Sequence, residues 1–279
     1  MTWKIKVIGL LLSATMGLKN LFVGTRELGF DKGNKIFKIE HISNLEPGFF
    51  ESSGLERADG ITFYTHTDSD GMPYLYRFNT EGDFLDTLKL NALNNVDWED
   101  IAQDEDGNFY IGDFGNNLNK RKHLQIYVLG RSTIDSIQFN YESQKDFFLK
   151  KGGPNYDCEA MFWFQNSLYL FSKNKKDQWV KAYRISDQPG NYELQPLDSV
   201  YLPHRITAAD IDVESGHFML LGYGMVYTFK MSDENIFSEP GYAIKLSKGG
   251  QAEALVMTDS TTALITNEKG KIFKLTQKK

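Results

Sequence analysis

Five segments of the chain repeat one three-part pattern, and this repetition restricts the fold more than any other feature. Each segment opens with a small or acidic residue followed by an apolar pair. A second apolar strand then ends in a polar loop, and a third strand carries an aliphatic-aromatic-x-apolar pattern, in which Ala182 once replaces the larger aliphatic residue. The aromatic residues of the third strands recur at spacings of 51, 56, 44 and 46; they are Tyr76, Tyr127, Tyr183, Tyr227 and Phe273. A period in this range with three or four strands per unit is typical of a β-propeller blade.

The pattern inside each segment favours strands over helices. Apolar and polar residues alternate at 108–111 and 181–185, whereas helical repeats would place apolar residues three and four positions apart. Turn-forming pairs stand between the first and second strands, where a tight hairpin is required. These pairs are Asp106-Gly107, Gln165-Asn166 and Ser215-Gly216. The sequence therefore predicts an all-β protein with a single propeller domain.

The two ends of the repeat array predict how the ring closes. The chain ends at Lys279, directly after the fifth unit, so the last blade lacks its outer strand. An additional strand pattern precedes the first unit, over residues 34–47. We expect this N-terminal strand to complete the last blade and give five blades, with the propeller over 36–279 and a linker over 21–35. Since residues 36–39 also resemble a third strand, a sixth, degenerate blade is the alternative.

Residues 1–20 have the order of a secretory signal. Lys4 and Lys6 precede an apolar run from Val7 to Leu12, which small residues follow. The run is too short to span a membrane, so no membrane span is expected once the signal is removed. We expect a bacterial protein that is periplasmic or secreted. A short N-terminal strand or buried segment is the alternative.

Net charge and cysteine content limit the classes of binding partner and of covalent cross-link that we expect. The formal net charge is -6, and it would become about -9 without the three lysines of residues 1–20. An acidic surface argues against nucleic acid, which needs a basic face. The single cysteine, Cys158, allows no internal disulfide and is expected to be a small buried hydrophobe. We expect a monomer.

Aligning the starts of the five repeats identifies one position as the candidate site. It is occupied by Ser53, Glu99, Glu159, Ala209 and Glu253. The innermost strand of a propeller blade runs along the central channel, so its first residues should lie at one mouth. The loops between second and third strands should reach the same face. The other residues assigned to this mouth are Asp68, Trp98, Asp113, Asn117, Lys173 and Glu268.

Three carboxylates around a narrow channel predict an unusual electrostatic environment. Either some of them take up protons, which raises their pKa, or a cation binds between them. Oxygen ligands suit calcium or magnesium, so Glu99, Glu159 and Glu253 are the candidate metal ligands. Lys173 could hold an anionic or sugar-like ligand beside them.

Several polar and aromatic residues near the predicted mouth could have a structural role in place of a ligand-binding one. Asp100 and Asp210 are expected to bond backbone amides of neighbouring blades more than a ligand, and Trp98 could either stack on a sugar ring or pack between blades. The runs 68–71 and 104–107 are similar to calcium-binding loops but lack the spacing of an EF-hand, and acid-glycine pairs are ordinary turn formers.

The most distinctive blocks are Asn95–Ala102 and Gly112–Asn117, together with the short motifs 157–161 and 251–255. In these blocks the chain resembles a group of bacterial propellers related to the NHL-type and phytase-like propeller proteins, over most of residues 50–278. The resemblance implies a propeller fold and export. It implies no activity, since propellers host binding, scaffolding and hydrolysis alike.

Three functions are compatible with these features. The first is an exported propeller that binds a small polar or carbohydrate-like ligand at the acidic mouth. The second is a metal-assisted hydrolase of an ester, lactone, phosphoester or glycoside, with Glu99, Glu159 and Glu253 on a cation and Asp113 or Asp68 as the base. The third is a scaffold that binds a protein through an exposed apolar patch away from the mouth.

Overall fold

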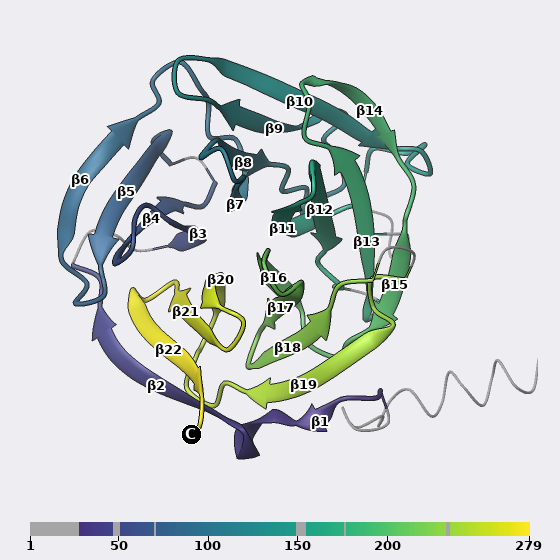
Figure 1. Ribbon diagram of the computed structural model, residues 1–279. Helices are drawn as coiled ribbons and strands as arrows, with labels where there is room; N and C mark the ends of the chain where they lie inside the picture. The colour runs from purple at the N-terminus through teal and green to yellow at the C-terminus, as the bar shows by residue number, and fades with distance from the viewer. Residues whose placement is uncertain (1–27, 47–50, 70, 149–154, 176, 233–234) are drawn as a thin grey trace, which may run out of the picture.

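The computed structural model describes residues 28–46, 51–69, 71–148, 155–175, 177–232 and 235–279. Five sheets, antiparallel except at the outer edge of two of them, stand around a central axis as the blades of a propeller (Figure 1). This arrangement confirms the predicted fold class and the count of five blades. The signal expected over residues 1–20 lies outside the described residues.

Each blade is built outward from an inner strand at the axis. Blade 1 contains β3 (Ser52–Arg57), β4 (Thr62–Thr67), β5 (Tyr74–Asn79) and β6 (Phe84–Lys89). Blade 2 contains β7 (Trp98–Gln103), β8 (Phe109–Asp113), β9 (Leu124–Leu129), β10 (Ile134–Tyr141) and β14 (Gly190–Leu194). Blade 3 contains β11 (Cys158–Phe164), β12 (Ser167–Ser172), β13 (Trp179–Ser186) and β15 (Asp198–Tyr201).

The last two blades include the N-terminal part of the chain. Blade 4 contains β16 (Ile206–Asp212), β17 (His217–Gly222), β18 (Met225–Lys230), β19 (Glu239–Lys245) and β1 (Asp31–Lys32). Blade 5 contains β20 (Ala252–Asp259), β21 (Thr262–Asn267), β22 (Lys271–Gln277) and β2 (Phe37–Asn44). A 3-10 turn, η1 (Gly33–Lys35), joins β1 to β2.

The N-terminal strand closes the ring as predicted. β2 pairs antiparallel with β22, with Phe37 opposite Gln277 and Asn44 opposite Lys271. The alternative of a sixth blade is therefore wrong. The described end of the predicted linker also packs on the propeller, because Phe30 is buried against Tyr227 and Phe229 and β1 pairs with β19.

Two blades have an additional strand on their outer edge. β14 pairs parallel with β10 in blade 2, and β1 pairs parallel with β19 in blade 4. Each covers a row of backbone groups that would otherwise be exposed at a sheet edge. The described residues contain no helix that is long and apolar enough to cross a membrane.

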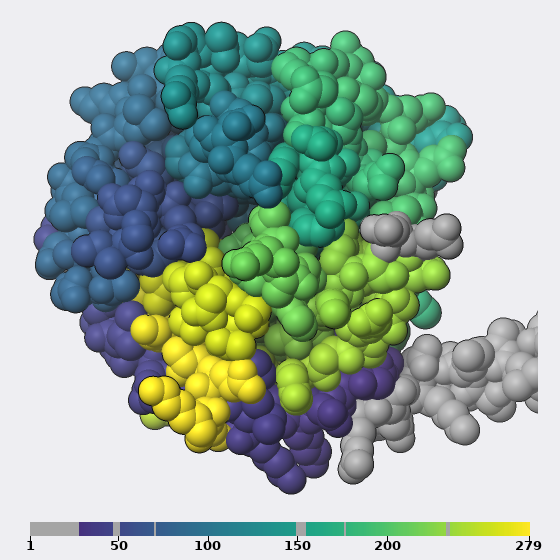
Figure 2. All heavy atoms as spheres, viewed as in Figure 1, coloured from purple at the N-terminus to yellow at the C-terminus, as the bar shows by residue number. Residues whose placement is uncertain are grey.

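Aromatic and aliphatic side chains fill the space between neighbouring blades. The sphere view shows neighbouring blades in contact around the ring (Figure 2). Phe218 of β17 stacks on Phe229 of β18 with ring centroids 5.0 Å apart, and Phe162 of β11 joins them from blade 3. Cys158 is fully buried in the core, as expected. This packing holds the inner strands in fixed positions around the axis.

Candidate functional site

Every inner strand has a β-bulge near its first residue, and these bulges create the site. A bulge inserts one unpaired residue and changes the direction in which its side chain points. The irregular residues are Ser53 with Gly54, Glu99, Glu159, Thr207 and Glu253. The repeat alignment placed Ala209 at the equivalent position in blade 4, and this is wrong. Ala209 pairs regularly with Leu220, two residues beyond the bulge.

The bulge residues divide into two groups by chemistry. In blades 1 and 4 they are hydroxyl residues that tie one blade to the next. Ser53 donates its hydroxyl to the carbonyl of Glu99 at 2.8 Å, and Thr207 donates to the carbonyl of Ala252 at 2.8 Å. In blades 2, 3 and 5 the bulge residue is a glutamate. Three glutamates therefore lie at equivalent positions near the start of their inner strands, as the sequence predicted.

Two of these glutamates form a buried acidic set with an aspartate that the sequence analysis missed. Oxygen atoms of Glu99, Asp157 and Glu159 all lie within 4.8 Å of one another. Glu99 is 5% exposed, Asp157 0% and Glu159 3%. Glu159 Oε1 is buried, and no donor group among the described residues reaches it. We call these three residues the inner acid set.

A second set adjoins the first and shares Glu99. Oxygen atoms of Asp68, Asp97 and Glu99 also lie within 4.8 Å of one another, and the two aspartates are partly exposed. A methyl group at Gly115 would come within 2.1 Å of Glu99 Oε1 and 2.4 Å of Asp97 Oδ2, so this close approach requires glycine. We call these three the outer acid set.

Burial and mutual repulsion change the acidity of both sets. Burial, followed by the charge of Glu159, raises the pKa of Glu99 well above its ordinary value. Burial, followed by the charge of Asp157, does the same for the pKa of Glu159. Burial raises the pKa of Asp97 to about 6, and Asp68 adds to the shift. At neutral pH the acid sets must therefore hold protons or a positive charge.

Lys173 supplies part of that positive charge. Its ammonium lies 2.5 Å from Glu159 Oε2, and the side chain is largely buried. Burial alone would lower the pKa of Lys173, but Glu159 and its neighbours raise it above the ordinary value. Lys175 forms an ion pair with Asp157. Two carboxylates of the inner acid set thus have a lysine partner, and Glu99 has none among the described ion pairs.

Glu253 forms another wall of the mouth together with Tyr223. The Tyr223 hydroxyl donates to Glu253 Oε1 at 2.7 Å, and the Lys173 ammonium lies 5.7 Å from the centre of the Tyr223 ring. Burial raises the pKa of Glu253 to about 7, although Lys173 and the Tyr223 hydroxyl act in the opposite direction. Nearby, Glu268 accepts a hydrogen bond of 2.6 Å from Gln251.

Two residues assigned to the mouth, Trp98 and Asp113, have structural roles instead. Trp98 is fully buried and donates its indole N–H to the carbonyl of Asn94, so neither ring face is free to stack on a sugar. Asp113 is fully buried and accepts from the Asp97 amide, Arg121 and Gln125, which leaves it unsuited to act as a base. Asn117, which was also assigned to the mouth, is exposed and accepts from Lys175, the ion-pair partner of Asp157.

Asp100 and Asp210 lock the blades together, which confirms that expectation. Asp100 accepts from the amides of Met161 in blade 3 at 2.9 Å and Ala209 in blade 4 at 3.3 Å. Asp210 accepts from the amide of Met257 in blade 5 at 2.6 Å. Asp104 caps its own turn by accepting from the amides of Asp106 and Asn108, so that run is a turn former.

Sequence reasoning could have found Asp157 and Asp97. Both precede a bulge glutamate by two residues, so the pattern Asp-x-Glu occurs at the start of blades 2 and 3. The alignment considered only one column of the repeat and therefore overlooked the column two residues earlier. Tyr223 follows β17 and shows no comparable signal.

Comparison with known proteins finds no matching family model and no matching curated sequence. The fold is similar to that of the PQQ-bound aldose sugar dehydrogenase from Streptomyces coelicolor, with 10% identity, a TM-score of 0.54 and coverage of 87% of this chain and 98% of the other. It is also similar to a structure described as a putative gluconolactonase, with 11% identity, a TM-score of 0.51 and coverage of 89% and 93%. The chain spans 61% of the length of a matched chain from the mitotic checkpoint complex, with 11% identity, a TM-score of 0.45 and coverage of 81% of this chain. At these identities the comparisons show a propeller fold.

Proposed function

We propose that this protein is an exported propeller whose acidic mouth binds a divalent cation, and that the bound cation anchors a small polar, carbohydrate-like ligand. The inner acid set carries the proposal, because it brings three buried carboxylates within 4.8 Å and leaves Glu159 Oε1 without a donor. A buried carboxylate oxygen is costly unless it is hydrogen-bonded or binds a cation. A cation between the three side chains would remove this cost.

The chemistry of the donors fits calcium or magnesium. The inner acid set offers only carboxylate oxygens, which are the ligands that these hard cations prefer. No histidine or cysteine belongs to either acid set, so a soft metal is not favoured. Glu99, Asp157 and Glu159 would hold the cation, whereas sequence analysis had named Glu253 as the third ligand. The cation would supply a fixed positive charge for hydroxyl or carbonyl oxygens of a ligand.

The groups around the mouth support a polar ligand. Asp68, Asp97 and Glu253 are partly exposed, and they offer acceptors for ligand hydroxyl groups. Export rests on the secretory pattern of residues 1–20, and a relationship to NHL-type and phytase-like propellers rests on the blocks at 95–102 and 112–117. The propeller fold alone carries neither of these two inferences.

Calorimetric titration of calcium, and separately of magnesium, into the chelator-treated protein tests the cation site. We expect Glu99→Gln, Asp157→Asn and Glu159→Gln each to weaken binding at least about tenfold, since each removes one charged ligand. Glu105→Gln is the matched control, because Glu105 is an exposed acid on the turn at the opposite end of β7. Absence of binding by the parent protein, or equal loss in the control, would contradict the proposal.

Metal-assisted hydrolysis is the second candidate, and Glu253 favours it. A carboxyl group with a pKa of about 7 can accept a proton at neutral pH and return it to a leaving group. Glu253 would take this role in place of Asp113, and Tyr223 would fix its orientation through the 2.7 Å hydrogen bond. An assay with a neutral ester and a lactone tests this: activity lost in Glu253→Gln with unchanged calcium affinity would establish it, and a parent protein without activity on either would remove it.

A further inference from the structure

The outer acid set adjoins the inner acid set, and together the two sets span three blades. Asp68 follows β4 of blade 1, Asp97 and Glu99 belong to blade 2, and Asp157 and Glu159 belong to blade 3. Glu99 is the side chain that both sets share. A carboxylate has two oxygen atoms, so Glu99 can bind a different cation on either side.

The outer acid set has no positive partner of its own. Among the described residues, none of its three carboxylates forms an ion pair, whereas the other two acids of the inner set each pair with a lysine. The Glu99 side chain is only 5% exposed, and its carboxylate accepts no hydrogen bond from any described residue. A buried carboxylate without a partner is costly, and a cation in the outer set would remove that cost.

A single divalent cation does not balance the charge of the mouth. The two sets contain five carboxylates with two lysine partners, so three negative charges remain when all the acids are ionised. A cation in the inner acid set neutralises two of these charges and leaves Asp68 and Asp97 within 4.8 Å of each other. Like charges at this separation repel, whereas a second cation would convert them into ligands.

The backbone around the outer acid set holds its members together. Asn95 Nδ2 donates to two carbonyls at the end of β4, among them that of Asp68 at 2.9 Å, and this fixes the loop of blade 1 against blade 2. Because Gly115 has no side chain, Glu99 Oε1 and Asp97 Oδ2 can converge beside it. The three carboxylates are therefore positioned before any ion binds.

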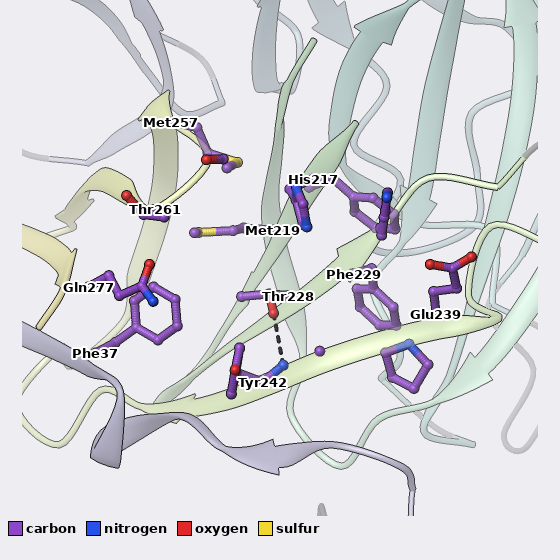
Figure 3. Close-up of a pocket in the computed structure, with 15 residues that line it drawn as sticks. Phe37, His217, Met219, Thr228, Phe229, Glu239, Tyr242, Met257, Thr261 and Gln277 are labelled. Atoms are coloured by element: carbon purple, nitrogen blue, oxygen red, sulfur yellow. Dashed lines mark hydrogen bonds between the residues drawn. The ribbon is translucent and has the colours of Figure 1, made fainter. Parts of the chain in front are cut away.

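Two hollows at the opposite end of the propeller lack these properties. A cavity of about 440 Å³ lies between blades 4 and 5 (Figure 3). Its apolar lining belongs to the core, as the 1% exposure of Met219 shows, and Glu239 is the one carboxyl group among its described lining residues. A hollow of about 330 Å³ between blades 2 and 3 is acidic, but its buried carboxylate, Asp187, accepts hydrogen bonds from Trp163 and Gln188.

We propose that the outer acid set binds a second divalent cation, and that Glu99 bridges the two cations with one carboxylate oxygen on each. This inference rests on the proposed function, which places the first cation in the inner acid set. The three inner residues are at most 5% exposed, whereas Asp68 and Asp97 are partly exposed, so the outer cation is the one that a ligand reaches. Hydroxyl or carboxylate oxygens of a sugar-like ligand replace water on this cation. Asp68 and Asp97 thus act on the ligand through the cation.

The number of bound ions tests the second cation. Calorimetric titration of calcium into the chelator-treated protein should give two ions per chain. Asp97→Asn should remove the outer ion and Asp157→Asn the inner one, whereas Glu99→Gln should weaken both by at least about tenfold. Glu105→Gln is the control for binding to surface acids, because Glu105 lines the acidic hollow between blades 2 and 3, and it should keep both ions.

The outcomes separate this inference from the proposed function. One ion in the parent protein, lost in Asp157→Asn and retained in Asp97→Asn, would overturn the second cation and leave the first. No binding at all would overturn both. Two ions that keep their affinity in Glu99→Gln would overturn the bridge. Should Asp97→Asn not fold, Asp68→Asn removes another ligand of the same ion and should have the same effect.

Terbium luminescence tests which ion faces the ligand. Terbium binds the oxygen ligands of calcium sites, and Trp98, which precedes Glu99 in β7, can transfer excitation to it. The difference between the luminescence lifetimes in H₂O and D₂O reports the water bound to the ion. Asp157→Asn keeps the outer ion and should show more bound water than Asp97→Asn, which keeps the inner ion. Equal or reversed hydration would overturn the assignment of the outer ion to the ligand.

Discussion

At the scale of single residues, Lys173 determines how strongly the mouth attracts a cation. Its ammonium already neutralises Glu159, so it competes with any cation that uses the same carboxylate. We expect Lys173→Met to increase calcium affinity by roughly tenfold, because like charges at this distance repel. Titration calorimetry at constant ionic strength measures the change, with Lys269→Met as the control, since Lys269 is exposed. A weaker affinity in Lys173→Met would show that Lys173 organises the site instead.

Individual site residues could be predicted where the repeat marks them, and the polar loops added Asp68 and Lys173. Glu99, Glu159 and Glu253 occupy an aligned column, and the structure places all three at bulges. Whether a side chain of a polar loop reaches the channel depends on its local hydrogen bonds, as the buried and fully bonded Asp113 shows. The partners of Asp113 lie 8 to 16 residues away on other strands and loops, and the sequence alone does not show that their side chains turn toward it.

At the scale of elements, the inner strands depend on Asp100 to hold three blades together. Its carboxylate accepts amides from β11 and β16 while belonging to β7. We expect Asp100→Ala to lower the free energy of unfolding by about 3 kcal/mol, since it leaves buried amides without acceptors. Urea denaturation measures this loss, and Asp106→Ala, on an exposed turn of the same blade, should change stability by less than about 0.5 kcal/mol. Equal losses of stability in Asp100→Ala and Asp106→Ala would contradict the role of Asp100 in holding the blades together.

Strand pairing in blade 4 explains why the repeat alignment of that blade was wrong. In the run Thr207-Ala208-Ala209-Asp210, Asp210 follows Ala209 as Asp100 follows Glu99 in blade 2, so spacing alone aligned Ala209 with the glutamates. The bulge lies between Ile206 and Ala208, and it shifts the register by one residue against β17. Alternation of side chains defines the strand, but the position of a bulge depends on how neighbouring strands pair.

At the scale of the whole molecule, the five-blade ring followed from periodicity because each repeat needs a neighbour on either side to bury its apolar faces. The closing strand was also predictable, because an open last blade would leave an exposed edge. The parallel strands β14 and β1 were not predicted, since their sequences carry no repeat signal. In addition, β14 lies between two strands of blade 3 but pairs with blade 2, and β1 precedes a strand of blade 5 but pairs with blade 4. The cavity between blades 4 and 5 likewise results from packing across distant segments.

The acidic mouth links the stability of the whole molecule to pH and to the cation. The pKa of Asp97 is raised to about 6 and that of Glu253 to about 7, both mainly by burial, so the folded state binds protons more tightly than the unfolded state. The stabilisation from these two protons is complete below the ordinary carboxyl pKa and is lost as pH rises through these values. In chelator, Tm should fall by roughly 5 °C between about pH 5 and about pH 8. Saturating calcium should remove part of this fall, because a cation bound to Glu99 would favour the ionised form of the neighbouring Asp97, whereas Glu253 is not a proposed ligand. Differential scanning calorimetry across this range measures both effects, and Glu105→Gln should leave both unchanged. A chelated protein whose Tm rises over the same interval would contradict the raised acidities on which the site depends.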